Sequence, residues 1–300
     1  MPHRDASSGP PASPHIATRF FPLSEPLRPY LSTIYLTEVA VADGARVVDY
    51  LHPEWANLRF VDGDPPRAAI GDGPVIEVPR FVATGPTSHA TRFAAGTMRT
   101  WGVGVLPMGW AKFIPLAADE LADRLCDGAA HPAFARVAPL AGPLGQIDDT
   151  DAAAALIDAH FCALLAEAPP DDPMILAAHA ALVDDDLSSV ADLSAKLGLS
   201  ERSIERLCHR AFGFSPKLLL RRQRFLRSLA RFMLDPSMAW IDTMDHLYYD
   251  QAQFTRDFQR FMGMGPRDYA TLPKPILGAA AFARTAAFGA PVQGLHRPAG

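Results

Sequence analysis

The feature that most constrains the fold is an internal repeat, in which residues 250–266 match residues 200–216 position by position. Both copies begin with a short oxygen-bearing residue suited to a helix N-cap, and both place glycine three positions before a final proline. Apolar residues recur between them at helical spacing, and Arg206 of the first copy aligns with Arg256 of the second. Each copy therefore predicts one amphipathic helix with a single apolar face.

A shorter helical segment precedes each copy. Residues 189–198 start with serine, carry apolar residues at helical spacing and end in glycine. A helix, a tight glycine turn and a capped second helix form the helix-turn-helix pattern. Residues 240–247 offer a rougher version of the same first helix, and residues 217–234 lack Gly and Pro and are rich in Leu and Arg. The sequence thus predicts two helix-turn-helix units joined by one long helix.

The charge of the chain is unevenly distributed. The formal net charge is −5, but residues 1–183 hold 12 basic and 21 acidic residues, whereas residues 196–231 hold 10 basic and 2 acidic residues. A positive field concentrated on one domain is typical of a surface that binds phosphates. The predicted partner of the first unit and the connecting helix is therefore a nucleic acid.

The two units resemble the C-terminal DNA-binding domain of the AraC/XylS family of bacterial transcription regulators over about residues 186–271. The resemblance rests on SERSIERLCHRAFGFSP in the first unit, and on YYDQAQFTRDF with GMGP in the second. Two departures concern the second unit, where Leu247 replaces a usual turn glycine and residues 240–245 replace the usual Ile-Ala helix. The resemblance implies double-stranded DNA as a partner, and it leaves contacts with RNA polymerase and a homodimer open.

Helical geometry indicates which side chains of this domain could contact DNA. Polar residues opposite the apolar face can reach base edges, where Arg suits guanine and Gln suits adenine. Basic residues beside that face are better placed for phosphates. The predicted DNA-binding residues are Lys196, Ser200, Glu201, Arg202, Ser203, Glu205, Arg206, Arg210, Lys217, Arg221, Arg222, Gln251, Gln253, Thr255 and Arg256.

The N-terminal half has a different pattern. From Tyr30 to about Lys112, short apolar or alternating runs are separated by turn dipeptides such as Asp-Gly, which predicts a small β-sandwich or barrel. From Leu116 to Leu165 the composition changes to Ala, Leu and Asp at helical spacing, so helices are expected there. This half is similar to the cupin-like sensing domain of the same regulators. The predicted fold class is α+β, with a β-rich domain followed by an all-α domain.

The expected organisation follows from these changes of composition. It comprises a disordered segment at 1–14, a β-rich sensing domain with C-terminal helices at 15–165, a linker with three prolines at 166–173, the double helix-turn-helix domain at 174–272 and a flexible tail at 273–300.

The histidines and cysteines do not predict a metal site. None of the ten histidines has the H-x-H spacing of a metal-binding cupin, the three cysteines are far apart, and no G-x-S-x-G motif occurs. We therefore predict no metal, no cofactor and no catalytic residue. The β-rich half could instead bind an apolar small molecule through aromatic side chains, although such side chains are more often core residues. The candidates are Trp55, Phe81, Phe93, Trp101 and Trp110.

A cytoplasmic transcription regulator that senses a small molecule is the predicted function. No apolar run approaches the ~20 residues that span a membrane, and no secretory signal is evident. One alternative is a small-molecule-modifying β-barrel enzyme with a helical protein-interaction domain, which would require convergent ionisable groups in the β-rich half. A second alternative makes the helix pairs a protein-interaction module, which would show no salt-dependent binding to DNA.

Overall fold

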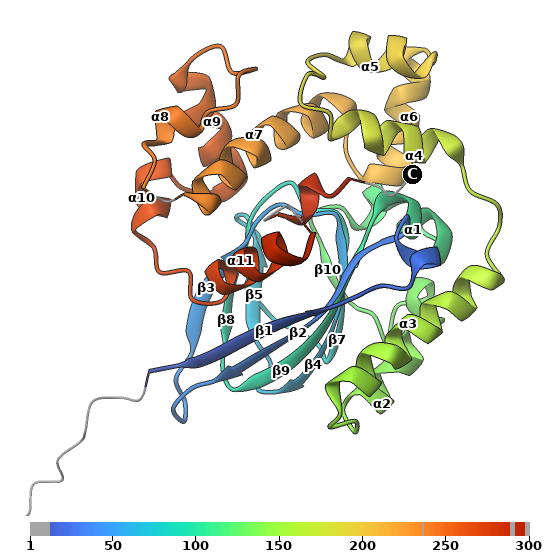
Figure 1. Cartoon of the computed structure of the whole chain (residues 1–300), viewed down its shortest axis with the longest axis vertical. Coiled ribbons are helices and arrows are strands. Elements are labelled where there is room, and N and C mark those ends of the chain that lie inside the picture. Colours follow the sequence, from blue (N-terminus) through green and yellow to red (C-terminus); the bar gives the residue numbers. More distant parts are fainter. Residues whose placement is uncertain (1–12, 236, 289–291, 298–300) are drawn as a thin grey trace, which may run out of the picture.

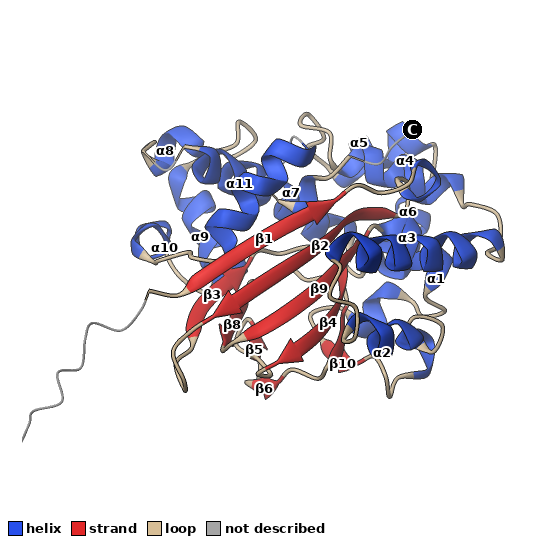
Figure 2. Ribbon diagram, turned by 60° about the horizontal axis from the view of Figure 1, so that its bottom comes forward, coloured by secondary structure: helices blue, strands red, loops and turns tan. Residues whose placement is uncertain are grey.

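Two antiparallel sheets form the N-terminal half of the computed structural model, which describes residues 13–235, 237–288 and 292–297. Figure 2 shows the larger sheet, with β1, β2, β9 and β4 side by side. The six-stranded sheet has the order β1 (His15–Phe21), β2 (Leu31–Ala40), β9 (Met98–Val105), β4 (Ala56–Gly63), β7 (Phe81–Thr84) and β10 (Leu125–Asp127), and the four-stranded sheet has the order β3 (Val47–Leu51), β8 (Thr91–Ala95), β5 (Arg67–Ile70) and β6 (Ile76–Glu77).

Alternation of side chains explains why the strands of the smaller sheet bury one face. In β8, Thr91, Phe93 and Ala95 are buried whereas Arg92 is exposed, which is the period-two pattern of a half-buried strand. The buried faces of the two sheets enclose an apolar cluster that includes Val61, Val82 and Phe93. The predicted β-rich domain is therefore confirmed, and its strands begin earlier in the chain than expected, at His15.

The segment after the sheets is less helical than its composition predicts. Only one long helix forms there, and the rest is short turns of helix. A proline in the first turn of η3 (Pro132–Phe134) and of η4 (Ala138–Leu140) bars continuation from the preceding residues. The helical elements of this half are η1 (Glu25–Leu27), α1 (Pro107–Phe113), η2 (Ala118–Leu121), η3 (Pro132–Phe134), η4 (Ala138–Leu140), α2 (Ala141–Leu144) and α3 (Thr150–Ala166).

The C-terminal half is helical, and Figure 1 shows α7 running between two groups of shorter helices above one end of the sheets. The first group lies before α7 in the chain and the second after it. The helices are α4 (Pro173–Leu182), α5 (Val190–Leu197), α6 (Glu201–Phe212), α7 (Pro216–Leu234), α8 (Trp240–Thr243), α9 (Gln251–Met262) and α10 (Pro266–Thr271). This arrangement confirms the predicted α+β class.

The two halves share one packed core. The largest apolar cluster extends from the six-stranded sheet through α1 and α3 into α4, α5 and α6. At the junction, the ring of Trp55 lies 5.7 Å from that of Phe212 and 5.3 Å from that of His179. All three side chains are almost completely buried. The helical half is therefore docked on the β-rich half rather than held only by the segment between α3 and α4.

The segment expected to be a flexible tail contains regular elements among its described residues. It forms α11 (Leu277–Phe288), which contacts β1, β3 and α7, and η5 (Gln293–Leu295). The buried carboxylate of Asp49 accepts hydrogen bonds from the amides of Ile276 and Leu277, both at 2.8 Å, which anchors the start of α11. The disordered segment expected at 1–14 lies outside the described residues up to residue 12.

Candidate DNA-binding surface and effector pocket

The first helix-turn-helix unit is formed by α5 and α6. The Ser189 side chain caps α5, and Gly198 then takes a left-handed conformation with φ of 65°, which a residue with a Cβ rarely adopts. Ser200 caps α6 by accepting a hydrogen bond from the Ser203 amide. Ile204 is completely buried, so the opposite face of α6 points to solvent. This unit has the geometry that the sequence predicts.

The second unit presents α9 in the same way. The Asp250 side chain accepts from the Gln253 amide at 2.6 Å, and the Gln253 side chain accepts from the Tyr249 amide at 3.0 Å, so both side chains fix the start of the helix. Phe254 and Phe258 are buried beneath the helix. Its first helix, α8, has only four residues. The second unit is therefore a shortened version of the first with an equivalent recognition helix.

A buried carboxylate supports the turn in which Leu247 replaces glycine. Asp245 accepts from the Leu247 amide at 3.0 Å, and it forms an ion pair with Arg227 of α7 at 2.5 Å. The amide of Asp245 also donates to the Ser228 hydroxyl at 2.8 Å. These bonds attach the turn to the connecting helix, so a left-handed glycine is not required here.

A second buried carboxylate attaches α9 itself to α7. The Asp257 side chain is only 1% exposed, and it accepts from Arg221, from Arg224 at 3.1 Å and from the Tyr248 hydroxyl at 3.2 Å. Breaking a buried ion pair is strongly destabilising because it leaves an uncompensated charge. Asp257 therefore positions the second recognition helix, a role that the repeat did not reveal because its counterpart in the first copy is Leu207.

Some of the candidate base-contacting side chains are exposed, whereas others form hydrogen bonds within the helix caps. Ser203 and Gln253 are half-buried and take part in the helix caps, so they shape the surface rather than project from it. Two outward faces of polar side chains remain, one on each recognition helix. The exposed candidates are Glu201, Arg202, Glu205 and Arg206 on α6 and Gln251, Thr255 and Arg256 on α9, with the capping Ser200 beside them.

The candidate phosphate contacts differ in their exposure and in their ion pairs. Lys217 is exposed, whereas Lys196 and Arg210 form surface ion pairs with Asp184 and Asp172 that DNA could replace. Arg221 is partly exposed and shared with Asp257, as described above.

The structure does not support Arg222 as a phosphate contact, which the sequence predicted. Its side chain is completely buried between α7 and the β-rich half, where its guanidinium lies 4.0 Å from the ring centre of Trp55. It cannot reach a phosphate in this conformation. Counting charges along α7 therefore overstates the positive surface, because Arg224 and Arg227 also serve internal ion pairs.

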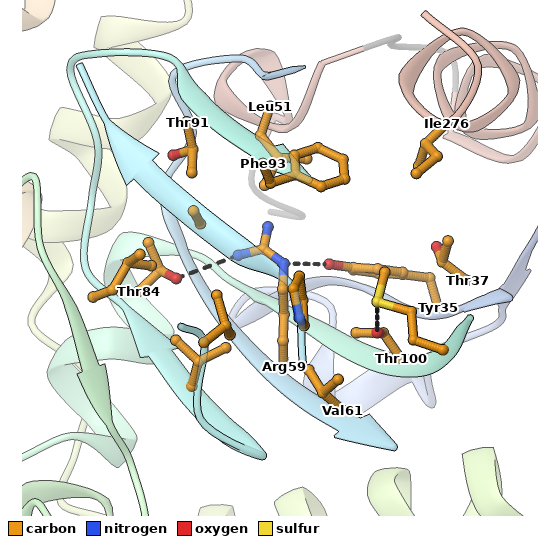
Figure 3. A pocket seen from close by; sticks show the side chains of 16 residues that line it. Tyr35, Thr37, Leu51, Arg59, Val61, Thr84, Thr91, Phe93, Thr100 and Ile276 are labelled. Carbon is orange, nitrogen blue, oxygen red and sulfur yellow. Dashed lines mark hydrogen bonds between the residues drawn. The ribbon is translucent and has the colours of Figure 1, made fainter. Parts of the chain in front are cut away.

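A small apolar cavity of about 100 Å³ lies between the two sheets (Figure 3). Both sheets supply its walls, and Ile276, just before α11, adds one more side chain. It is lined by Tyr35, Thr37, Leu51, Arg59, Val61, Pro66, Ala68, Val78, Val82, Thr84, Thr91, Phe93, Met98, Thr100, Leu125 and Ile276.

Arg59 is the charged group of this cavity. It donates to the Tyr35 hydroxyl at 2.9 Å and to the Thr84 hydroxyl at 3.3 Å, as drawn in Figure 3, and it pairs with Glu54 at 2.6 Å. Burial opposes its charge, but Glu54 and Tyr35 outweigh that effect and raise the pKa of Arg59 above its usual value. Three of its five N–H groups donate to described residues, so a ligand acceptor could be added.

The five aromatic candidates lie in different parts of the structure, and four of them do not face this cavity. Phe93 lines it, whereas Phe81, Trp101 and Trp110 belong to the main packed core. Trp55 lies at the junction with the helical half, as described above. Their size and apolar character could not distinguish a core position from a pocket wall. Arg59, the charged residue of the cavity wall, was not among the candidates because a single arginine in a strand gives no local signal.

Ser88, His89 and Asp123 form a group that resembles a hydrolytic triad. The Ser88 hydroxyl lies 3.0 Å from His89 Nδ1 but donates directly to Asp123 at 2.7 Å. In a catalytic triad the histidine bridges serine and carboxylate through its two different nitrogens. Here the same nitrogen faces both, and Asp123 also accepts from the Ser88 amide at 2.6 Å, so the group braces a loop.

Among residues 13–235, 237–288 and 292–297, no three His, Cys, Asp or Glu side chains gather in a way that could hold a metal ion. Within the same residues, no helix combines the length and apolar character that crossing a membrane requires.

Comparison with known proteins identifies the helical half. Residues 193–271 match the family model described as a helix-turn-helix domain, and no curated protein matches the chain. A structure of ToxT from Vibrio cholerae shares 9% identity at a TM-score of 0.43, covering 85% of this chain and 97% of that one. A structure of the AraC-like transcriptional activator CuxR shares 14% identity at a TM-score of 0.26, covering 72% and 87%. Because both TM-scores are below 0.5, the assignment of the helical half rests on the helix-turn-helix match alone.

Proposed function

We propose that the chain is a transcription regulator of the AraC/XylS type whose β-rich half binds a small, largely apolar effector, because residues 193–271 match a helix-turn-helix domain. The observation that carries the proposal is the pair of capped recognition helices, α6 and α9, each with its apolar side buried and a polar side exposed. An α-helix with such a face fits the major groove of DNA.

The two units would read successive major grooves. They lie on either side of α7, whose 19 residues span about 28 Å at 1.5 Å per residue. Adding the width of the flanking helices brings the recognition helices close to the ~34 Å groove repeat. Arg206 and Arg256 occupy equivalent exposed positions and would supply the base contacts.

The effector would occupy the cavity between the sheets. The walls are apolar except for Arg59, a tyrosine and several threonines, and ligand pockets combine apolar walls with a few polar anchors. An apolar molecule with one hydrogen-bond acceptor or anionic group would satisfy Arg59. Neither a metal nor a cofactor is needed for such binding, and we propose no catalytic role for this site.

We propose the division of the chain into a sensing domain at 15–165, a connecting segment at 166–173 and a DNA-binding domain at 174–272. The absence of regular structure between the end of α3 and the start of α4 supports the central boundary. A regulator of this kind acts where the DNA is, in the cytoplasm of a bacterial cell. RNA polymerase and a second copy of the chain are the further partners we propose.

Fluorescence anisotropy of the full chain with duplex genomic fragments tests the proposal. Phosphate contacts release counterions, so affinity should fall steeply between 50 and 200 mM salt. A protein-interaction module would show no such dependence. If the folded chain bound no duplex fragment at 50 mM salt, the DNA-binding assignment would be wrong.

A further inference from the structure

Two loops connect the sheets at the same end of the cavity. Residues 52–55 join β3 to β4, and residues 85–90 join β7 to β8; in each case the chain passes from one sheet to the other. The strands on both sides line the cavity, through Leu51 and Arg59 around the first loop and through Thr84 and Thr91 around the second. A change in the separation of the sheets must therefore move the ends of both loops.

The two loops are bonded to each other. The Thr87 amide donates to the Glu54 carbonyl at 3.0 Å, and the Thr87 hydroxyl accepts from the Glu54 amide at 2.9 Å. The Glu54 side chain also pairs with Arg59 in the cavity wall. We call these two loops, residues 52–55 and 85–90, the docking platform.

The docking platform carries the DNA-binding domain. Arg222 of α7 donates to the Thr87 carbonyl at 2.9 Å and to the Glu54 carbonyl at 3.3 Å, so it holds one acceptor from each loop. The Ala90 amide donates to the carbonyl of Phe261 in α9 at 2.6 Å. The His52 ring lies 2.7 Å from the Tyr269 hydroxyl in α10.

The first unit touches the docking platform through a glycine. Gly213, which ends α6, has φ of 83°, and a Cβ built there would lie 2.8 Å from the ring of Pro86. The docking platform therefore contacts the end of each recognition helix as well as the helix between them. A displacement of the two loops would change how both units are held.

Arg222 makes the contact between α7 and the docking platform sensitive to small displacements. It is completely buried, its Nε and one terminal nitrogen have no partner among the described residues, and burial lowers its pKa to about 9. A buried charge needs well-formed hydrogen bonds to offset lost hydration. Stretching either carbonyl away from Arg222 favours its return to water.

The cavity is too small for an effector of ordinary size. It measures about 100 Å³, whereas ligand pockets usually measure roughly 300–1,000 Å³ and a cavity of ~150 Å³ holds one benzene ring. For the cavity to hold a larger molecule, the two sheets that form its walls must move apart. The loops at residues 52–55 and 85–90, which cross between the sheets, are then strained.

We propose that occupation of the cavity is transmitted to the DNA-binding domain through the docking platform, and that Arg222 is the contact that releases. This inference rests on the effector site proposed above. Filling the cavity separates the carbonyls of Glu54 and Thr87, weakens their hold on α7 and frees the two units from the β-rich half.

Filling the cavity from within tests this inference without a known effector. Ala68, in β5, lines the cavity and is buried, so Ala68→Phe places a phenyl ring in a space smaller than benzene requires, while Ala68→Val is the matched control that the space can hold. Val61→Phe overfills the cavity from the opposite sheet and serves if the first variant fails to fold.

Hydrogen exchange of the Ala90 amide reports docking, because its acceptor lies in α9. We expect Ala68→Phe in the full chain to raise exchange at Ala90 about tenfold, with α3 unchanged and Ala68→Val within about twofold. In an Arg222→Met background the same substitution should change exchange less than about twofold. If overfilled, folded variants left Ala90 exchange unchanged, or if the Arg222→Met background kept the full effect, the transmission inference would be overturned. Neither result bears on DNA binding or effector binding, which are measured separately.

Discussion

Replacing Asp257 with asparagine should detach the second recognition helix from α7. The carboxylate is almost completely buried and compensates Arg221 and Arg224. Removing one partner of a buried ion pair typically costs about 3–5 kcal/mol. Arg221 is 36% exposed and can turn to water, whereas Arg224 is 15% exposed and cannot easily do so. We therefore expect a loss near the lower limit, about 3 kcal/mol.

Hydrogen exchange of the α9 amides measures this loss, because the second unit can open without global unfolding. A loss of about 3 kcal/mol corresponds to exchange roughly 100-fold faster in α9, with α3 unaffected. Asp242→Asn is the matched control, since Asp242 is an exposed acidic residue of the same unit and should change exchange by less than about threefold. Equal protection of α9 in Asp257→Asn and Asp242→Asn would refute the positioning role of Asp257.

Three further predictions concern pH, salt and ligand. Burial lowers the pKa of His52 and His179 to about 3, below the ~6.5 of the unfolded chain, so their stabilising effect is full above pH 6.5 and is lost as pH falls toward 3. His52→Gln should reduce the slope of unfolding free energy between pH 6 and 4, measured by urea titration, by about 1.4 kcal/mol per pH unit; an unchanged slope would mean that His52 is solvated. Affinity for random duplex DNA should fall about 10²-fold between 50 and 200 mM salt for about four phosphate contacts, and a fall below threefold in anisotropy would exclude them. An apolar effector at 100 times its Kd should stabilise the wild type by about 2.7 kcal/mol in thermal denaturation but not Ala68→Phe, and equal stabilisation of both would place its site elsewhere.

The helical half was predictable because its signals are local. Caps at Ser200 and Asp250, apolar spacing and terminal glycines depend only on neighbours in the chain. The helix at Leu277–Phe288 was missed although its alanine-rich stretch favours a helix. Its anchor, Asp49, lies more than two hundred residues away, and no pattern along the chain reveals such a contact.

The candidate site residues were predictable only where local helical geometry determines their exposure, and not where contacts between distant residues do. Helical geometry places Arg206 and Arg256 on the exposed faces, and the structure has them exposed. Arg222 has the charge and the position on its helix that a phosphate contact would have, but tertiary packing buries it against Trp55. Likewise, the choice between core and pocket for Trp101 depends on which sheets face each other, which strand patterns alone do not determine.

Base preference measured for Arg206→Ala and Arg256→Ala tests most directly whether one chain reads two major grooves. Selection of random duplexes by the full chain gives the preferred bases, and anisotropy then gives the affinity of each variant for the selected site. Loss of one bidentate contact costs about 1–3 kcal/mol, so each substitution should weaken specific binding about 5- to 150-fold and relax a different base pair, with the two positions about ten base pairs apart. Binding to random sequence should change much less. If Arg256→Ala left both affinity and preference unchanged while Arg206→Ala abolished both, the second unit would not read DNA and the two-groove model would be contradicted.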